Sequence, residues 1–126
     1  MSKPVKMRLC VLCALLTAIL AGADVTGTWR GTIKTEMAYQ TTGGQIPAYM
    51  VLQQVDGKVT GSAGGSEKML FRIRDGQLNG DRLIVEASPK EGSVLRFLLT
   101  VKEDVLEGDV EENGRNIGTA KLKRER

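Results

Sequence analysis

The chain contains no histidine among its 126 residues, and its two cysteines, Cys10 and Cys13, both lie close to the N-terminus. Without histidine, the Ser-His-Asp and Cys-His catalytic arrangements and an imidazole general base are excluded. Zinc sites built on imidazole are excluded as well, and those built on thiolate would need the two N-terminal cysteines. Only carboxylate, lysine, tyrosine and serine chemistry remain for catalysis, and the sequence indicates neither a metal nor a cofactor.

The first 23 residues have the pattern of a secretory signal peptide. Three basic residues precede an uncharged apolar run, Leu9–Leu20, and Ala21-Gly22-Ala23 supplies the small residues that a signal peptidase recognises. The apolar run is shorter than the ~20 residues that a membrane-spanning helix needs. We therefore expect a signal helix in residues 1–23 and a mature, secreted or periplasmic domain in residues 24–126. No stable membrane insertion is expected after cleavage.

Removal of this segment changes both the charge and the cysteine content of the chain. Three of the 18 Lys and Arg residues lie in it, so the mature chain carries 15 basic and 15 acidic residues. A neutral domain has no long-range field to attract phosphate backbones or anionic lipids, and nucleic acid is not expected as a partner. Both cysteines are also removed, so the mature domain has no thiol and no disulfide.

Apolar and polar residues alternate with a period of two along the mature chain, which predicts β-strands. In the clearest case, Val25 to Ile33, apolar or glycine residues alternate with polar ones. Turn sequences such as Asp56-Gly57 and Asn113-Gly114 separate the strands, with one longer loop at Glu36–Ile46, and no amphipathic helix is recognisable. The expected strands are 25–34, 48–55, 58–63, 68–74, 82–88, 95–102, 106–111 and 115–123.

The register of the last hairpin follows from which residues share a face. A two-residue turn at Asn113-Gly114 would place Leu106 opposite Lys121 and so put a lysine on the apolar face. A three-residue loop that includes the preceding residue would place Leu106 opposite Ala120. Because a one-residue slip moves every side chain to the other face, we expect the three-residue loop, with Ile117 exposed.

Eight antiparallel strands with one apolar face can close as an up-and-down β-barrel, which leaves no open edge; a β-sandwich is the alternative. The sequence Gly27-Thr28-Trp29 resembles the G-x-W signature of the calycins, the lipocalin and avidin group. The resemblance implies a barrel of about eight strands with Trp29 packed at one end. It also implies a basic residue near the final strand stacked on that ring, with Lys121, Lys123 and Arg124 as candidates. The amino-acid sequence from Leu52 to Gly61 is similar to the sequences of small exported bacterial β-domains of unassigned role.

The interior of this barrel is either packed or hollow. Inward positions mix large and small side chains, and eight strands are just wide enough to be filled or to hold one small molecule. One glutamine of the pair Gln53-Gln54 faces inward, where it either lines a pocket or bonds to nearby backbone. The candidate ligand-binding residues are aromatic or polar residues at inward positions or near the expected mouth: Trp29, Tyr39, Tyr49, Gln54, Phe71 and Phe97.

Carboxylates are the remaining candidates for catalysis. Glu107, Asp109 and Glu111 line one face of an expected strand, where they alternate with apolar residues and are expected to be in solvent. A hydrolytic pair needs two carboxylates that flank a cleft, one of them with a pKa raised by burial. We therefore expect that the protein is not an enzyme.

Three functions fit this sequence. The first is an exported, non-catalytic barrel that binds a small apolar or amphipathic molecule. The second is a protein-interaction module or inhibitor with a packed core, which presents the loop 36–46 and a patch of Ile84, Leu98 and Ile117 to a protein partner. The third is an envelope structural domain without a ligand.

Overall fold

The computed structural model describes residues 23–35 and 44–125, and every regular element in this part of the chain is a β-strand. No helix among these residues is long and apolar enough to cross a membrane. The strands are β1 Gly27–Thr35, β2 Gln45–Val55, β3 Lys58–Ser66, β4 Met69–Asn79, β5 Arg82–Lys90, β6 Ser93–Lys102, β7 Val105–Glu112 and β8 Arg115–Arg124.

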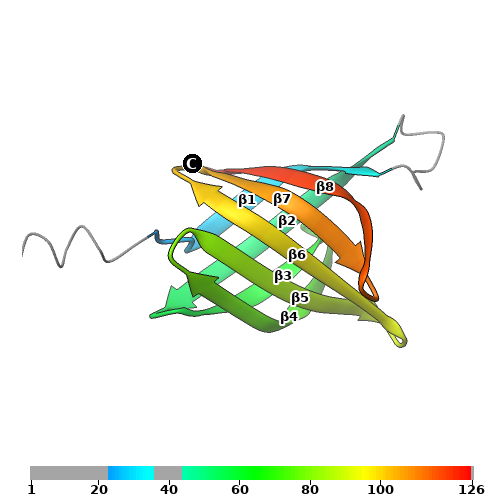
Figure 1. Cartoon of the computed structure of the whole chain (residues 1–126), viewed down its shortest axis with the longest axis horizontal. Helices are drawn as coiled ribbons and strands as arrows, with labels where there is room; N and C mark the ends of the chain where they lie inside the picture. The colour runs from blue at the N-terminus through cyan, green and yellow to red at the C-terminus, as the bar shows by residue number, and fades with distance from the viewer. Residues whose placement is uncertain (1–22, 36–43, 126) are drawn as a thin grey trace, which may run out of the picture.

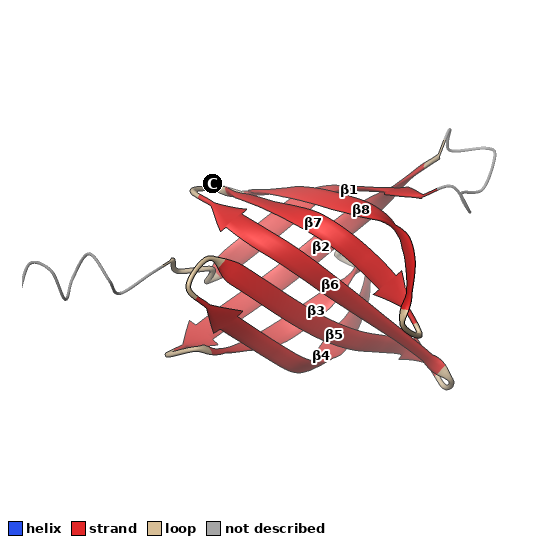
Figure 2. Cartoon of the chain, in the orientation of Figure 1, coloured by secondary structure: helices blue, strands red, loops and turns tan. Residues whose placement is uncertain are grey.

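Each strand pairs antiparallel with the next, and β8 pairs with β1, so that the sheet closes into a barrel (Figure 1). Figure 2 shows short turns at those connections between consecutive strands that are described in full. The closed barrel confirms the all-β, eight-stranded prediction and excludes the sandwich alternative. The proposed signal helix and most of the loop 36–46 lie outside the described residues.

The last hairpin corrects the predicted register. Asn113-Gly114 forms a two-residue turn in which both residues have positive φ, and this geometry matches the twist of the flanking strands. A bulge then follows in β8, and the extra residue brings Leu122, rather than Ala120, opposite Leu106. The three-residue loop was therefore wrong. The prediction that Ile117 is exposed was wrong too, because this side chain is half-buried and packs against the core.

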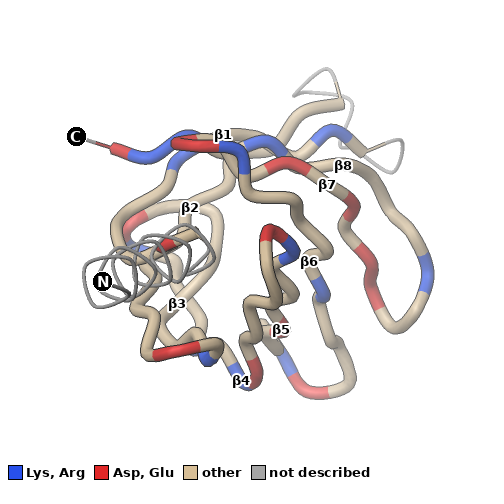
Figure 3. Tube along the Cα trace, turned by 60° about the vertical axis from the view of Figure 1, so that its left-hand side comes forward, with Lys and Arg blue, Asp and Glu red and all other residues tan. Residues whose placement is uncertain are grey.

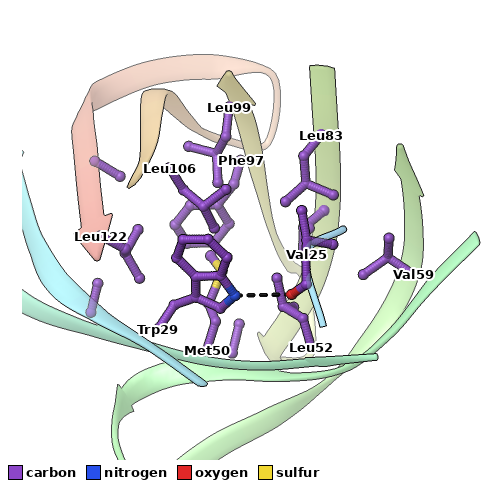
Figure 4. Close-up of a cluster of buried hydrophobic side chains, with 14 of the residues drawn as sticks. Val25, Trp29, Met50, Leu52, Val59, Leu83, Phe97, Leu99, Leu106 and Leu122 are labelled. Atoms are coloured by element: carbon purple, nitrogen blue, oxygen red, sulfur yellow. Dashed lines mark hydrogen bonds between the residues drawn. The ribbon is translucent and has the colours of Figure 1, made fainter. Parts of the chain in front are cut away.

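One end of the barrel is tightly packed. Trp29, Met50, Leu83, Leu106 and Leu122 are all fully buried, and together they come from five strands around the barrel. Figure 4 shows the indole ring of Trp29 in the middle of this cluster. The packing at this end is that of an ordinary close-packed protein core.

The outer surface carries charges of both signs, interspersed along the strands (Figure 3). Glu107 and Asp109 are exposed, and Glu107 lies 3.8 Å from the ammonium group of Lys121. Glu111 is half-buried on the same face of β7. Glu107 and Asp109 are therefore accessible to solvent on the outer surface, and burial does not set either of them apart.

Candidate functional site

Arg124 closes the packed end of the barrel. It lies opposite Trp29 in the β1–β8 register, and its guanidinium carbon is 4.4 Å from the centroid of the Trp29 ring. The same guanidinium donates hydrogen bonds to the carbonyl oxygens of Thr26 (2.6 Å) and Asp24 (2.8 Å) and to Asp104 Oδ1 (2.9 Å). One side chain thus joins the N-terminal segment, the β6–β7 turn and the strand that closes the barrel. Of the three basic candidates from the sequence, Arg124 occupies the position over Trp29.

The segment before β1 forms a plug at this end. Val25 is fully buried; its backbone N–H donates to Gln54 Oε1 (2.9 Å), and its carbonyl accepts the Trp29 Nε1–H (3.0 Å). Gln54 also donates through Nε2 to the carbonyl of Asp56 (2.9 Å). The side chain of Gln54 therefore forms hydrogen bonds with nearby backbone groups, which was the alternative to lining a pocket.

Tyr49 lies on the outer face of the barrel. It pairs with Arg30 across the β1–β2 ladder, while the next residue, Met50, points into the core. The guanidinium of Arg30 covers the Tyr49 ring at 4.7 Å from its centroid and forms ion pairs with Glu125 (2.5 Å) and Glu67 (2.7 Å). Hydrogen bonds to these two carboxylates raise the pKa of Arg30. Tyr49 is thus part of an external polar cluster and does not face the interior.

The opposite end of the barrel contains an apolar cavity of about 140 Å³. It lies where β1, β3 and β5 end and β2, β4 and β6 begin, because antiparallel pairing brings these ends to the same rim. None of the lining side chains carries a polar atom. The cavity is lined by Ile33, Ile46, Pro47, Ala63, Gly64, Gly65, Phe71, Ala87, Pro89, Leu95 and Phe97.

Small residues leave this space empty. Ala63 and Ala87 are both buried at inward positions, on β3 and β5, where larger side chains would reach across the barrel. Gly64 and Gly65 follow Ala63 and contribute no side chain at all. Since voids in protein interiors are few and small, a cavity of this size at the rim marks the barrel end that differs from an ordinary core.

The six sequence candidates are not brought together. Phe71 and Phe97 both line the cavity. Trp29 lies at the packed end, two inward-facing positions before Ile33 along β1. Tyr39 lies outside the described residues. With Tyr49 on the outer face and Gln54 in the plug, only the two phenylalanines mark the cavity.

Most cavity residues were not singled out from the sequence. The alternation of β1, β3, β5 and β6 does place several of them on the inner face, and that was the only available signal. An aliphatic or alanine residue on that face looks the same whether it packs or lines a void. The residues missed include Ile33, Ile46, Ala63, Ala87 and Leu95.

A larger hollow, about 870 Å³, lies on the outer surface beside β1 and β8. Its lining includes Lys34, Asp109 and Arg115, whose side chains are exposed to solvent. Such a hollow is a groove between surface side chains, and it would leave a small apolar molecule largely in contact with water. We therefore regard the smaller, apolar cavity as the candidate site.

The proposed apolar patch on the outer surface is smaller than the sequence indicated. Ile84 and Leu98 lie opposite each other on β5 and β6 and are half-buried. Ile117 is not part of this patch, because the bulge in β8 turns it toward the core. The exposed Val55 and Met69 lie at opposite ends of the barrel, at the end of β2 and the start of β4.

Polar atoms give no indication of a second site. Among residues 23–35 and 44–125, no group of three or more His, Cys, Asp or Glu side chains is placed to hold a metal ion. In the same ranges, every buried side-chain nitrogen or oxygen has a hydrogen-bond partner.

Comparison of the chain with protein-family models, with curated proteins and with solved structures finds no match.

We expect replacement of Arg124 by methionine to lower the free energy of unfolding by about 2–3 kcal/mol. The variant keeps an apolar chain over Trp29 but loses the charge-assisted hydrogen bonds and the cation–π contact. Urea denaturation followed by circular dichroism measures the difference. Lys123→Met on the exposed neighbouring position is the control; equal losses in the two variants would contradict the role given to Arg124.

Proposed function

We propose that this chain is an exported, non-catalytic, calycin-like barrel that binds a small apolar or amphipathic molecule in the cavity at its open end. The observation that carries the proposal is a cavity of about 140 Å³ whose lining side chains are all apolar, in a barrel whose other end is packed. Ligand sites are concave and mostly apolar, and burial of apolar surface supplies about 25 cal/mol per Å². The small molecule is the proposed partner, and nucleic acid is not.

Two sequence features support the remaining parts of the proposal. Gly27-Thr28-Trp29 at the start of β1, with Arg124 stacked on the tryptophan from the last strand, supports the calycin-like assignment. The basic start, apolar run and small-residue cleavage pattern of residues 1–23 support export, to the periplasm or out of the cell. The absence of histidine from the sequence and the exposed positions of Glu107 and Asp109 support a binding role rather than catalysis.

Filling the cavity tests the site. We expect Ala63→Leu to reduce the affinity for single-ring aromatics and short alcohols at least tenfold, because its larger side chain occupies the space between the β3 and β5 walls. Ligand-observed NMR and ligand-induced shifts in the melting temperature measure binding. Ser62→Leu, on the neighbouring position whose side chain points outward, is the matched control and should bind as the wild type does.

Two outcomes would argue against the proposal. If the wild-type protein binds no member of a broad apolar panel, the cavity has no ligand role of this kind. If Ala63→Leu binds as tightly as Ser62→Leu, the molecules bind somewhere other than the cavity.

A further inference from the structure

We infer that the cavity accepts only a small, uncharged apolar group of about six carbon atoms, such as a single ring or the end of an alkyl chain. Any larger ligand keeps its remaining atoms outside the mouth. This inference rests on the proposed function and adds to it the class of ligand that the site takes. It follows from the volume of the cavity, from what lies beneath it and from the chemistry of its walls.

The volume sets the size of the group. An apolar cavity of about 150 Å³ lined by Leu, Ile and Phe stays dry and binds benzene. The cavity in this barrel has a volume of about 140 Å³, and its lining includes Ile, Leu and Phe together with smaller residues, so it offers nearly the same room. A ring of six carbons therefore fills it.

The packed end of the barrel prevents deeper entry. The next inward residue below Ala87 on β5 is Val85, which is fully buried. Below Ile46 on β2, the inward residues are Ala48 and then Met50, and both are buried. Since this part of the interior is close-packed, a longer chain would have to displace core side chains, at a cost that its own burial does not recover.

The walls select against polar groups. No lining side chain offers a hydrogen bond, and a hydroxyl or charged group buried there would lose its water without gaining a side-chain partner. Only the mouth, where the cavity opens to solvent, leaves a polar group hydrated. An amphipathic ligand would therefore enter with its apolar end first.

A homologous series tests the size limit directly. Isothermal titration calorimetry with 1-alkanols from four to twelve carbons would measure how affinity depends on chain length. We expect affinity to rise about fourfold with each added methylene up to about six carbons and then to level off. We also expect 1,6-hexanediol to bind at least tenfold more weakly than 1-hexanol, because its second hydroxyl would be buried.

The outcomes separate the inference from the proposed function. Affinity that keeps rising through twelve carbons would overturn the size limit and leave the proposed binding role intact. An absence of binding for every member of the series would overturn both. A plateau near six carbons with weak binding of the diol supports both.

Enlarging the cavity gives a second test. We expect Phe71→Ala to move the plateau to chains that are longer by two or more carbons, because Phe71 forms part of the wall and its truncation enlarges the cavity. The Phe71 side chain is half-buried. Phe71→Leu, a smaller change with less effect on folding, should move it less. Met69→Ala, an exposed position on the same strand that does not line the cavity, is the control. A plateau that stays at six carbons in all three variants would show that the cavity does not set the limit.

Discussion

Replacement of Trp29 by alanine is expected to lower the free energy of unfolding by about 3–5 kcal/mol, a large part of the ~5–15 kcal/mol that stabilises a typical domain. Trp29 is fully buried and packs against side chains from strands on every side of the barrel end (Figure 4). Its loss would also leave the Val25 carbonyl without the indole donor and Arg124 without its ring. The void left by the indole, the missing hydrogen bond and the exposed guanidinium would each lower the stability of the folded protein.

Urea denaturation followed by far-ultraviolet circular dichroism measures this effect, since Trp29 is the only tryptophan and its fluorescence disappears with the substitution. Trp29→Phe is the matched control. It retains an aromatic ring in the core but lacks the Nε1–H donor, so we expect a loss between those of the wild type and the alanine variant. If the alanine and phenylalanine variants were equally stable, the volume of the indole would not be what holds this end together.

The strands and their inner faces were predictable because each strand buries one face and exposes the other. In β1 and β6 this condition imposes a strict period of two, which is visible in the sequence around Trp29 and Phe97. The turn residues between strands mark where the period restarts. Closure of the sheet into a barrel was one of two arrangements that the sequence allowed, and the structure selects it over the β-sandwich.

The register of β7 and β8 was not predictable from these rules, because two of them conflict. The turn chemistry of Asn113-Gly114 favours a two-residue turn, whereas face matching of Leu106 with an apolar partner forbids it in an unbroken ladder. The structure satisfies both through a bulge near Ile117, which adds one residue to β8. A bulge has no distinct signature in an alternating sequence, so it was not predicted. Neither of the two uninterrupted registers is the observed one.

The cavity could not be predicted because alternation gives the direction of a side chain but not its height in the barrel. Ala63 and Ala87 are far apart in the sequence and share one level only through the stagger of the strands. Aromatic residues were a poor guide for the same reason. Trp29 and Phe97 both point inward, yet only Phe97 reaches the open end.

Replacement of Gly31 by alanine is expected to destabilise the barrel by about 3 kcal/mol, the upper end of the range for overpacking. A Cβ atom at Gly31 would lie 1.8 Å from the carbonyl oxygen of Lys121 and 2.6 Å from the Cα of Leu122. Both are backbone atoms of β8, so no side-chain rotation relieves the collision. The chain can accommodate the methyl group only by separating β1 from β8, the pair that closes the barrel.

Gly65→Ala is the matched control for this prediction. Its nearest neighbour would be the Pro47 carbonyl oxygen at 3.9 Å, an ordinary van der Waals distance, and we expect a change in stability within about 0.5 kcal/mol. Chemical denaturation measures both variants. Equal effects would mean that glycine is required in these strands for some reason other than close approach.

Hydrogen exchange then distinguishes loss of closure from a general loss of stability. If Gly31 permits the β1–β8 contact, its replacement should raise exchange most at amides that bond across this pair, such as those of Thr32 and Lys121. Amides in the β4–β5 pair, on other strands of the barrel, should change only by the global loss. A uniform increase over all eight strands would instead mean that the barrel opens as one cooperative unit, and that its closing seam is no weaker than the rest.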